Sequence, residues 1–226
     1  IHAQACPYLQ VRDLSVNFVR GDALIFDDCS DLLLAGIDIQ DCSGLGIRIH
    51  GGKQHLVHSC RVDSMGRGGI DLWAGDWQQL APAHSTIENC RISNLSRIDR
   101  TYTPAVLLEG MGLKVRHNSF IDIPSSAIRL EACDALIELN HFRRCVYESG
   151  DQGAIDMWGN PLYRGNIIRW NDFDRIIASD KHRGAAAVRH DDFISGFMVT
   201  ENTIRKGSGW GAFGAIQFNQ GTDNYA

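Results

Sequence analysis

The chain repeats one short pattern eight times, and this repeat limits the possible folds more than any other feature. Each copy is an alternating eight-residue segment such as LLLAGIDI, HLVHSCRV or NIIRWNDF. Successive copies lie 22 to 31 residues apart, and a period of this length indicates a solenoid, in which each unit is buried by its neighbours. The third position of every copy is apolar: Val11, Leu34, Val57, Ile87, Val115, Ile137, Ile168 and Val199.

A second alternating segment follows each copy, as in GIRIHG, GIDLWA and AIDMWG. Each unit is therefore predicted to hold two short strands. Because successive strand side chains point to opposite sides, alternation assigns one set to the core. The pairs expected to face inward are Ile47/Ile49, Ile70/Leu72, Val106/Leu108, Ile128/Leu130 and Ile155/Met157.

Two kinds of solenoid fit this repeat. The L-x-V-x-x-N-x-F pattern around Asn118 also fits a leucine-rich repeat, but those units carry one strand each, and here a second strand follows every time. We therefore predict an all-β fold, a right-handed parallel β-helix of about eight coils. It is expected to form a single domain over residues 1–226 that ends within a coil.

The sixth position of the first segment changes from apolar residues to asparagine along the chain. Stacked asparagines can pair their amides from coil to coil. Cys60 and Cys90 occupy the same column, where a disulfide is possible but two buried thiols are favoured. The column reads Leu14, Ile37, Cys60, Cys90, Asn118, Asn140, Asn171 and Asn202.

Composition narrows the class of protein. The formal net charge is −5, which argues against a broad nucleic-acid-binding surface, and no apolar run approaches the roughly 20 residues that span a bilayer. The seven cysteines include no C-x-x-C pair, so we predict no zinc site, no other metal and no cofactor. The chain begins without Met, and we expect a piece of a larger secreted or periplasmic protein that has no nucleic-acid or membrane partner.

Long insertions interrupt the short corners of the solenoid. One set precedes the second strand in later coils, and another follows it, so the two sets are expected to border the outer face of the second sheet as the walls of a groove. The sequences of the first set are SNLSRIDRTYTP, RRCVYESGDQG, DRIIASDKHRGAA and RKGSGWGAFG, and those of the second are WAGDWQQLAPAH and WGNPLYRG.

The outward positions of the second strand supply the floor of this groove. Exposed tryptophans can stack on sugar rings while acids and arginines bind hydroxyls, so we predict a polysaccharide or oligosaccharide ligand. The alternative is a surface charge ladder of little energetic weight, with a loop covering Trp158. The substrate-binding candidates are Trp73, Arg129, Glu131, Asp156, Trp158, Arg189 and His190.

Glycoside hydrolysis needs two carboxyl groups, about 5–5.5 Å apart for retention of configuration and about 6.5–9.5 Å apart for inversion. Asp151 precedes one strand, and Asp191 and Asp192 end the next one in RHDDF. From alternation alone, Asp156 with Asp191 is the most obviously adjacent pair, whereas Asp151 requires its loop to fold over the groove.

Four segments resemble a known family: VYESGDQGAIDMWGN, RGNIIRWNDFDRI, GAAAVRHDDFISGFMVTENTI and FGAIQFNQGTDN. They are similar to the bacterial β-helical glycoside hydrolases that include a pectin α-L-fucosidase and a xylanase. The resemblance implies that Asp151 and either Asp191 or Asp192 form the catalytic pair, with Asp192 preferred. Asp156 replaces the usual Tyr, and His190 stands where an apolar residue is common, so the substrate does not transfer.

Two other functions stay open. A polysaccharide lyase would remove a proton beside a uronate carboxylate, with Lys181, Arg189 or His190 as the base. A non-catalytic glycan-binding β-helix would need no acid at all. The prediction from sequence is a glycoside hydrolase that acts on a plant or microbial polysaccharide.

Overall fold

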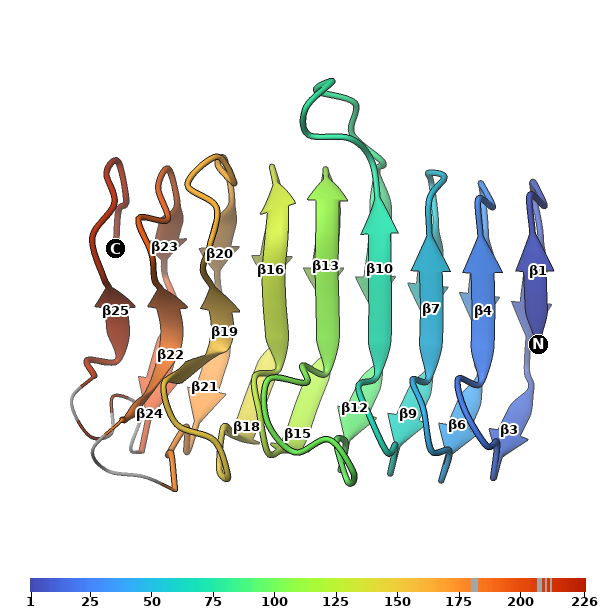
Figure 1. The fold of residues 1–226 in the computed structure, drawn as a ribbon, viewed down its shortest axis with the longest axis horizontal. Helices are drawn as coiled ribbons and strands as arrows, with labels where there is room; N and C mark the ends of the chain where they lie inside the picture. The colour runs from blue at the N-terminus through green and yellow to red at the C-terminus, as the bar shows by residue number, and fades with distance from the viewer. Residues whose placement is uncertain (180–182, 207–208, 210, 212) are drawn as a thin grey trace.

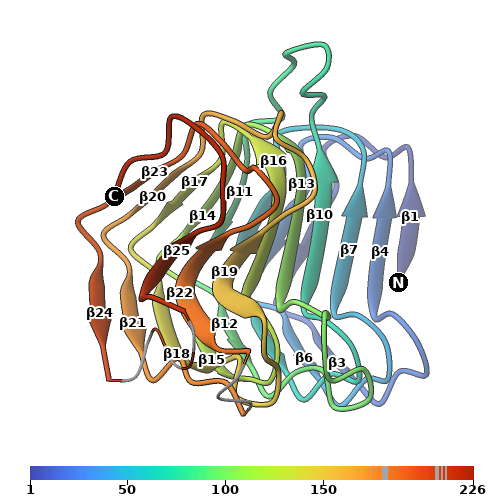
Figure 2. The same cartoon turned by 60° about the vertical axis from the view of Figure 1, so that its left-hand side comes forward.

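A computed structural model of the chain describes residues 1–226 except 180–182, 207–208, 210 and 212. In the described part, 25 short strands wind into a solenoid, and no residue is helical (Figure 1). The strands form three parallel sheets of nine, eight and eight members, which lie around the long axis as the faces of a prism (Figure 2). This architecture is the right-handed parallel β-helix predicted from the repeat.

Sheet 1 holds the second strand of each predicted unit. Its members, in spatial order, are β1 (His2–Gln4), β4 (Leu24–Asp27), β7 (Ile47–His50), β10 (Ile70–Ala74), β13 (Val106–Met111), β16 (Ile128–Cys133), β19 (Gln152–Met157), β22 (Ala185–His190) and β25 (Ile216–Phe218).

Sheets 2 and 3 are built from the first segment of each unit. Sheet 2 contains β2 (Gln10–Arg12), β5 (Leu33–Ala35), β8 (Leu56–His58), β11 (Ser85–Glu88), β14 (Leu113–Arg116), β17 (Leu136–Glu138), β20 (Ile167–Arg169) and β23 (Met198–Thr200). Sheet 3 contains β3 (Ser15–Asn17), β6 (Asp38–Gln40), β9 (Arg61–Asp63), β12 (Arg91–Ser93), β15 (Ser119–Ile123), β18 (His141–Cys145), β21 (Asp172–Asp174) and β24 (Thr203–Arg205).

The strand register follows the repeat. In sheet 2 the apolar third positions pair with one another from Val11 on β2 to Val199 on β23. The residues predicted to face inward on sheet 1, from Ile47 to Met157, are all buried. Stacked rings continue the core behind sheet 3, where the Phe142 ring lies 4.9 Å from Phe120 and 4.6 Å from Phe173. The alternation therefore assigned the core correctly.

The prediction of two strands in each unit is wrong, because each coil has three. The eight-residue segment bends in its middle, where one residue per coil has a left-handed backbone with φ between 50° and 64°. Such a residue turns the chain sharply, so β2 ends before it and β3 begins after it. The corner residues are Asp13, Gly36, Ser59, Asn89, His117, Leu139, Trp170 and Glu201.

The predicted asparagine ladder lies directly after this corner. The Nδ2 of Asn118 donates to Oδ1 of Asn140, that of Asn140 to Asn171, and that of Asn171 to Asn202, each over 3.0 Å. The same oxygens accept backbone N–H groups of the preceding coil, as at Asn118 (2.9 Å). Cys60 and Cys90 extend the column as free thiols. The ladder thus saturates a buried corner.

The described insertions leave the solenoid at two edges of sheet 1, as predicted, whereas parts of the two insertions before β22 and β25 lie outside the described residues. Residues 75–84 project beyond the end of β10, and residues 158–166 follow β19 at the same edge (Figure 1). The long connections before β13 and β19 lie at the opposite edge. The described part of the chain contains no helix that is long and apolar enough to cross a membrane.

Candidate functional site

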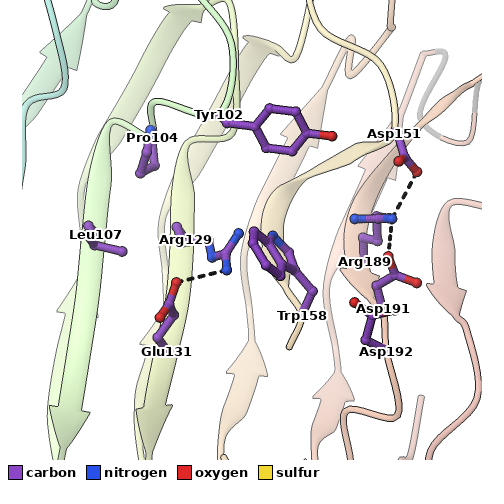
Figure 3. Close-up of a pocket in the computed structure, with 10 residues that line it drawn as sticks. All are labelled: Tyr102, Pro104, Leu107, Arg129, Glu131, Asp151, Trp158, Arg189, Asp191 and Asp192. Atoms are coloured by element: carbon purple, nitrogen blue, oxygen red, sulfur yellow. Dashed lines mark hydrogen bonds and ion pairs between the residues drawn. The ribbon is translucent and has the colours of Figure 1, made fainter. Parts of the chain in front are cut away.

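A pocket of about 590 Å³ opens on the outer face of sheet 1, over strands β13 to β22. It brings together seven of the ten residues proposed from the sequence, and Figure 3 shows them around one opening. These seven are Arg129, Glu131, Asp151, Trp158, Arg189, Asp191 and Asp192, and the other lining residues are Tyr102, Pro104 and Leu107.

Arg189 is the centre of the pocket's polar network. Its Nη2 donates to Oδ1 of Asp151 over 2.9 Å and to Oδ2 of Asp191, and its Nη1 donates to Oδ1 of Asp156 over 3.3 Å. The guanidinium is buried, so these contacts are not a solvated surface ladder. A single positive charge therefore holds three aspartates together, two of which line the pocket.

The strand register explains why these residues meet. Arg189 on β22 pairs with Asp156 on β19, which in turn pairs with Arg129 on β16. Gly153 makes room for the arginine, because a side chain at Gly153 would approach the Arg189 Cβ to 2.9 Å. Adjacent strands lie about 4.8 Å apart, so the column places its charges within contact distance.

Asp151 reaches the pocket because its loop folds over the groove, which was the condition stated from the sequence for its role. Its backbone N–H donates to the carbonyl of Gly184 over 3.0 Å, and its φ of 61° is left-handed. The Asp151 side chain is 45% exposed. It is thus anchored through Arg189 yet accessible from solvent.

Asp156, which was predicted to contact substrate, is buried in the structure, with only 1% of the residue exposed. Its Oδ1 accepts from Arg189 and from the backbone N–H of Gly153. Burial raises the pKa of Asp156 to about 6, and the positive charges of Arg189 and Arg129 act in the opposite direction. Asp156 therefore lies beneath the pocket and holds the Arg189 guanidinium in place through its hydrogen bond.

Asp191 and Asp192 end the β22 segment in different environments. Asp191 is largely buried and is held by Arg189 and by the side-chain amide of Asn219. Asp192 is exposed and lies in the pocket wall, with a φ of 50°, and Phe193 after it has a φ of 65°. Two consecutive left-handed residues without glycine are uncommon, and such backbone is found preferentially at functional sites.

Arg129 and Trp158 form the other wall. The Arg129 guanidinium lies 3.4 Å from the Trp158 ring centre and donates to Glu131 over 2.8 Å. Burial lowers the pKa of Arg129, while the charges of Glu131 and Asp156 act against this shift. Trp158 remains 36% exposed, so the arginine orients the indole without covering it completely.

His190, which was also predicted to bind substrate, lies in the core and not in the pocket. Its ring is fully buried between Phe197 and Phe218, whose centres are each 4.8 Å away. Burial lowers the pKa of His190 to about 4, so the ring is neutral at pH 7. Since side chains alternate along β22, a residue between outward-facing Arg189 and Asp191 points to the core.

Trp73 lies outside this pocket. It is 53% exposed on β10 and lines a separate hollow of about 630 Å³ beneath the projecting residues 75–84. Trp73 and Trp158 lie on the same face of sheet 1, with β13 and β16 between β10 and β19.

Sequence reasoning missed Tyr102 and Asn219 as contributors to the site. Tyr102 is in the inserted segment SNLSRIDRTYTP and lines the pocket, whereas Asn219 follows β25 and binds Asp191. Asn219 follows Phe218, which pairs with His190, so the repeat places it beside Asp191, and this position was a usable signal. Among the described residues, no group of three or more potential ligands is arranged to hold a metal ion.

One comparison with known proteins gives a match. The family model described as "Right handed beta helix region" matches residues 22–224. The chain belongs to the right-handed β-helix family. No curated protein and no solved structure matches this β-helix chain. The resemblance to the glycoside hydrolases therefore stays a prediction.

Proposed function

We propose that this β-helix protein is a glycoside hydrolase that cleaves a plant or microbial polysaccharide in the pocket over β13 to β22. The observation that carries the proposal is that Asp151 and Asp191, both bound to Arg189, line one pocket together with Asp192 and an accessible tryptophan. Glycosidic hydrolysis requires two carboxyl groups that flank one bond, and sugar rings pack on aromatic faces.

The arrangement of the acids suits this chemistry. Asp151 and Asp191 contact the same Arg189 nitrogen, which holds the Asp151 carboxylate beside the end of β22. Asp192 follows Asp191 directly and offers a carboxyl group at the exposed rim.

We assign the reacting pair to Asp151 and Asp192. Both are accessible in the pocket, whereas the Asp191 carboxylate has both oxygens engaged, one with Arg189 and one with Asn219. Asp191 and Arg189 would then act as positioning residues that fix Asp151 in its loop. Trp158 would pack on the sugar ring at the cleaved bond.

The lyase alternative has weaker support. A lyase base must reach the substrate, but His190 is buried in the core and the Arg189 guanidinium is shared among three carboxylates. Lys181, the third base considered, lies outside the described residues. The arginines are also matched by acids, which leaves little positive charge for a uronate carboxylate.

The test is a screen of pectin, xylan, fucan and alginate with two readouts. Hydrolysis releases reducing ends without the ultraviolet absorbance of unsaturated uronates, and this is the expected result on at least one polymer. A rise in that absorbance would establish a lyase instead. Retention of a polymer on the protein without any cleavage would support the non-catalytic glycan-binding reading.

A further inference from the structure

We propose that a second glycan-binding surface extends from the pocket along sheet 1 to Trp73, and that it binds the uncleaved part of a neutral sugar chain. Trp73, Glu109 and Glu131 on sheet 1 form the floor of this surface, and Trp77 and Tyr163 in the two loops form its side wall. This inference rests on the proposed hydrolase function. It requires the sugar chain to run along the solenoid axis from the pocket at Trp158 to Trp73.

The strand register provides a continuous row between the two tryptophans. Trp73 on β10 pairs with Glu109 on β13, and Glu109 pairs with Glu131 on β16. The next strand is β19, which Trp158 follows directly. Three steps of about 4.8 Å separate the tryptophans by roughly 14 Å along the axis, which is the reach of a short oligosaccharide rather than of one sugar.

The two loops at this edge of sheet 1 contact each other across the intervening strands. Trp77 in the projecting segment 75–84 packs edge-on against Tyr163 in segment 158–166, with ring centres 5.8 Å apart. Burial raises the pKa of Tyr163, and the nearby charges of Glu131 and Glu109 add to the effect. The loops therefore form one aromatic side wall beside the row of glutamates.

The exposed indole of Trp73 is placed so that a sugar ring can pack on it. A hollow of about 630 Å³ lies on one side of it, and a smaller one of about 290 Å³, which His50 also lines, lies on another. The His50 ring packs edge-on to the indole at 5.7 Å and is held by Asp71 over 3.0 Å. Lys53 and Gln54 line the larger hollow, so polar groups stand beside the aromatic face.

The charge of the surface selects a neutral ligand. Burial raises the pKa of Glu109, and the adjacent negative charges of Glu131 and Asp71 raise it further. Arg129 also contacts this row, but it is already paired with Glu131. A polyuronate would place more carboxylates against these acids, whereas neutral hydroxyl groups can donate to them.

The experiment measures affinity against chain length by calorimetry. All proteins carry Asp151→Asn to prevent turnover, and the probes are cellohexaose, xylohexaose, mannohexaose and hexagalacturonate, each with its disaccharide. At least one neutral hexasaccharide is expected to bind at least about tenfold more tightly than its disaccharide. Trp73→Ala removes this advantage, whereas Trp170→Ala, which truncates an exposed tryptophan at a corner between sheets 2 and 3, preserves it.

Three results would overturn the proposal in separate ways. Unchanged hexasaccharide affinity in Trp73→Ala would remove the second surface while leaving the hydrolase function intact. Tighter binding of hexagalacturonate than of every neutral hexasaccharide would refute the neutral substrate class. Absence of both binding and cleavage with the unsubstituted protein would refute the proposed function itself. Melting temperatures establish that each variant is folded.

Discussion

Two columns of polar residues run along the solenoid, and they satisfy their hydrogen bonds differently. In the asparagine ladder each amide joins its neighbour and the backbone of the adjacent coil. The outward column of sheet 1 instead leaves buried atoms without a protein partner among the described residues. These atoms are Nε of Arg48, Arg129 and Arg189, Oδ1 of Asp71 and Oε1 of Gln217.

This difference indicates that the asparagine ladder is structural and that the outward column of sheet 1 suits a ligand. Asparagine is short and neutral and carries both a donor and an acceptor, so a stack of identical residues closes on itself. The outward column mixes long charged groups whose hydrogen-bonding capacity exceeds what the neighbouring coil supplies. Because buried polar atoms without partners are costly, such a cluster points to function rather than to stability.

The largest effect is expected from breaking the ladder with Asn140→Leu. This change removes four hydrogen bonds, made by the N–H and Nδ2 of Asn118, the carbonyl of Val115 and Oδ1 of Asn171. Nδ2 of Asn118 still reaches Ile87 and Oδ1 of Asn171 still accepts the backbone N–H of residue 140, but the N–H of Asn118 loses its acceptor. At about 1 kcal/mol for each lost bond and about 1–3 kcal/mol for the orphaned N–H, the free energy of unfolding should fall by about 5 kcal/mol. Urea denaturation measures it, and Asn17→Leu at an exposed strand position is the control. A loss below about 1 kcal/mol would refute the structural role.

Most of this ladder and of the core could be predicted from the sequence, because a fixed period places equivalent residues in one column. The bend that splits the first segment was missed, since corner residues as different as Asp13, Leu139 and Trp170 carry no common signal for a left-handed backbone. Within the site, alternation found Arg189 and Asp191. It could not show that Arg189 covers Asp156, because cover depends on side-chain packing.

In the outward column of sheet 1, replacing both members of a buried ion pair should cost less stability than replacing one member. Arg189→Met alone leaves Asp156 as a buried carboxylate without its partner and should reduce the free energy of unfolding by about 3–5 kcal/mol. Adding Asp156→Leu removes that buried charge, so the double variant should recover most of this loss, although Asp151 and Asp191 still lack Arg189. Urea denaturation of both variants tests this, and equal losses in the two would contradict it.

The pH dependence separates two buried groups whose effects oppose each other. Asp156 binds its proton up to a pKa of about 6 when folded and loses it near 3.8 when unfolded, so it lowers stability as the pH rises from about 4 to 6. His190, with its pKa reduced from 6.5 to about 4, raises stability as the pH increases from about 4 to 6.5.

Replacing either Asp156 or His190 should reveal the effect of the remaining group on the pH dependence of stability. The difference in unfolding free energy between Asp156→Asn and the unsubstituted protein should increase by on the order of 3 kcal/mol from pH 4 to pH 7, because the opposing carboxyl group is gone. The same difference for His190→Phe should decrease over this range. Differences that do not vary with pH would show that folding shifts the pKa of neither group.

The smallest effect is expected at a solvated ion pair. Arg67 and Asp99 are joined over 3.0 Å, but both side chains are about half exposed. Asp99→Asn should therefore change the free energy of unfolding by less than about 0.5 kcal/mol. A loss comparable to that of Arg189→Met would mean that burial does not distinguish the two kinds of pair.

The most direct test of the site is the hydrolysis rate of Asp151→Asn and Asp192→Asn on a polymer that the unsubstituted protein cleaves. Asp41→Asn is the matched control, because Asp41 also has a left-handed backbone and an arginine partner, Arg97, but lies after β6 away from the pocket. Each site variant should lose about 10²–10⁴-fold in kcat while remaining folded, and the control should keep its activity. Full activity in both Asp151→Asn and Asp192→Asn would contradict the account.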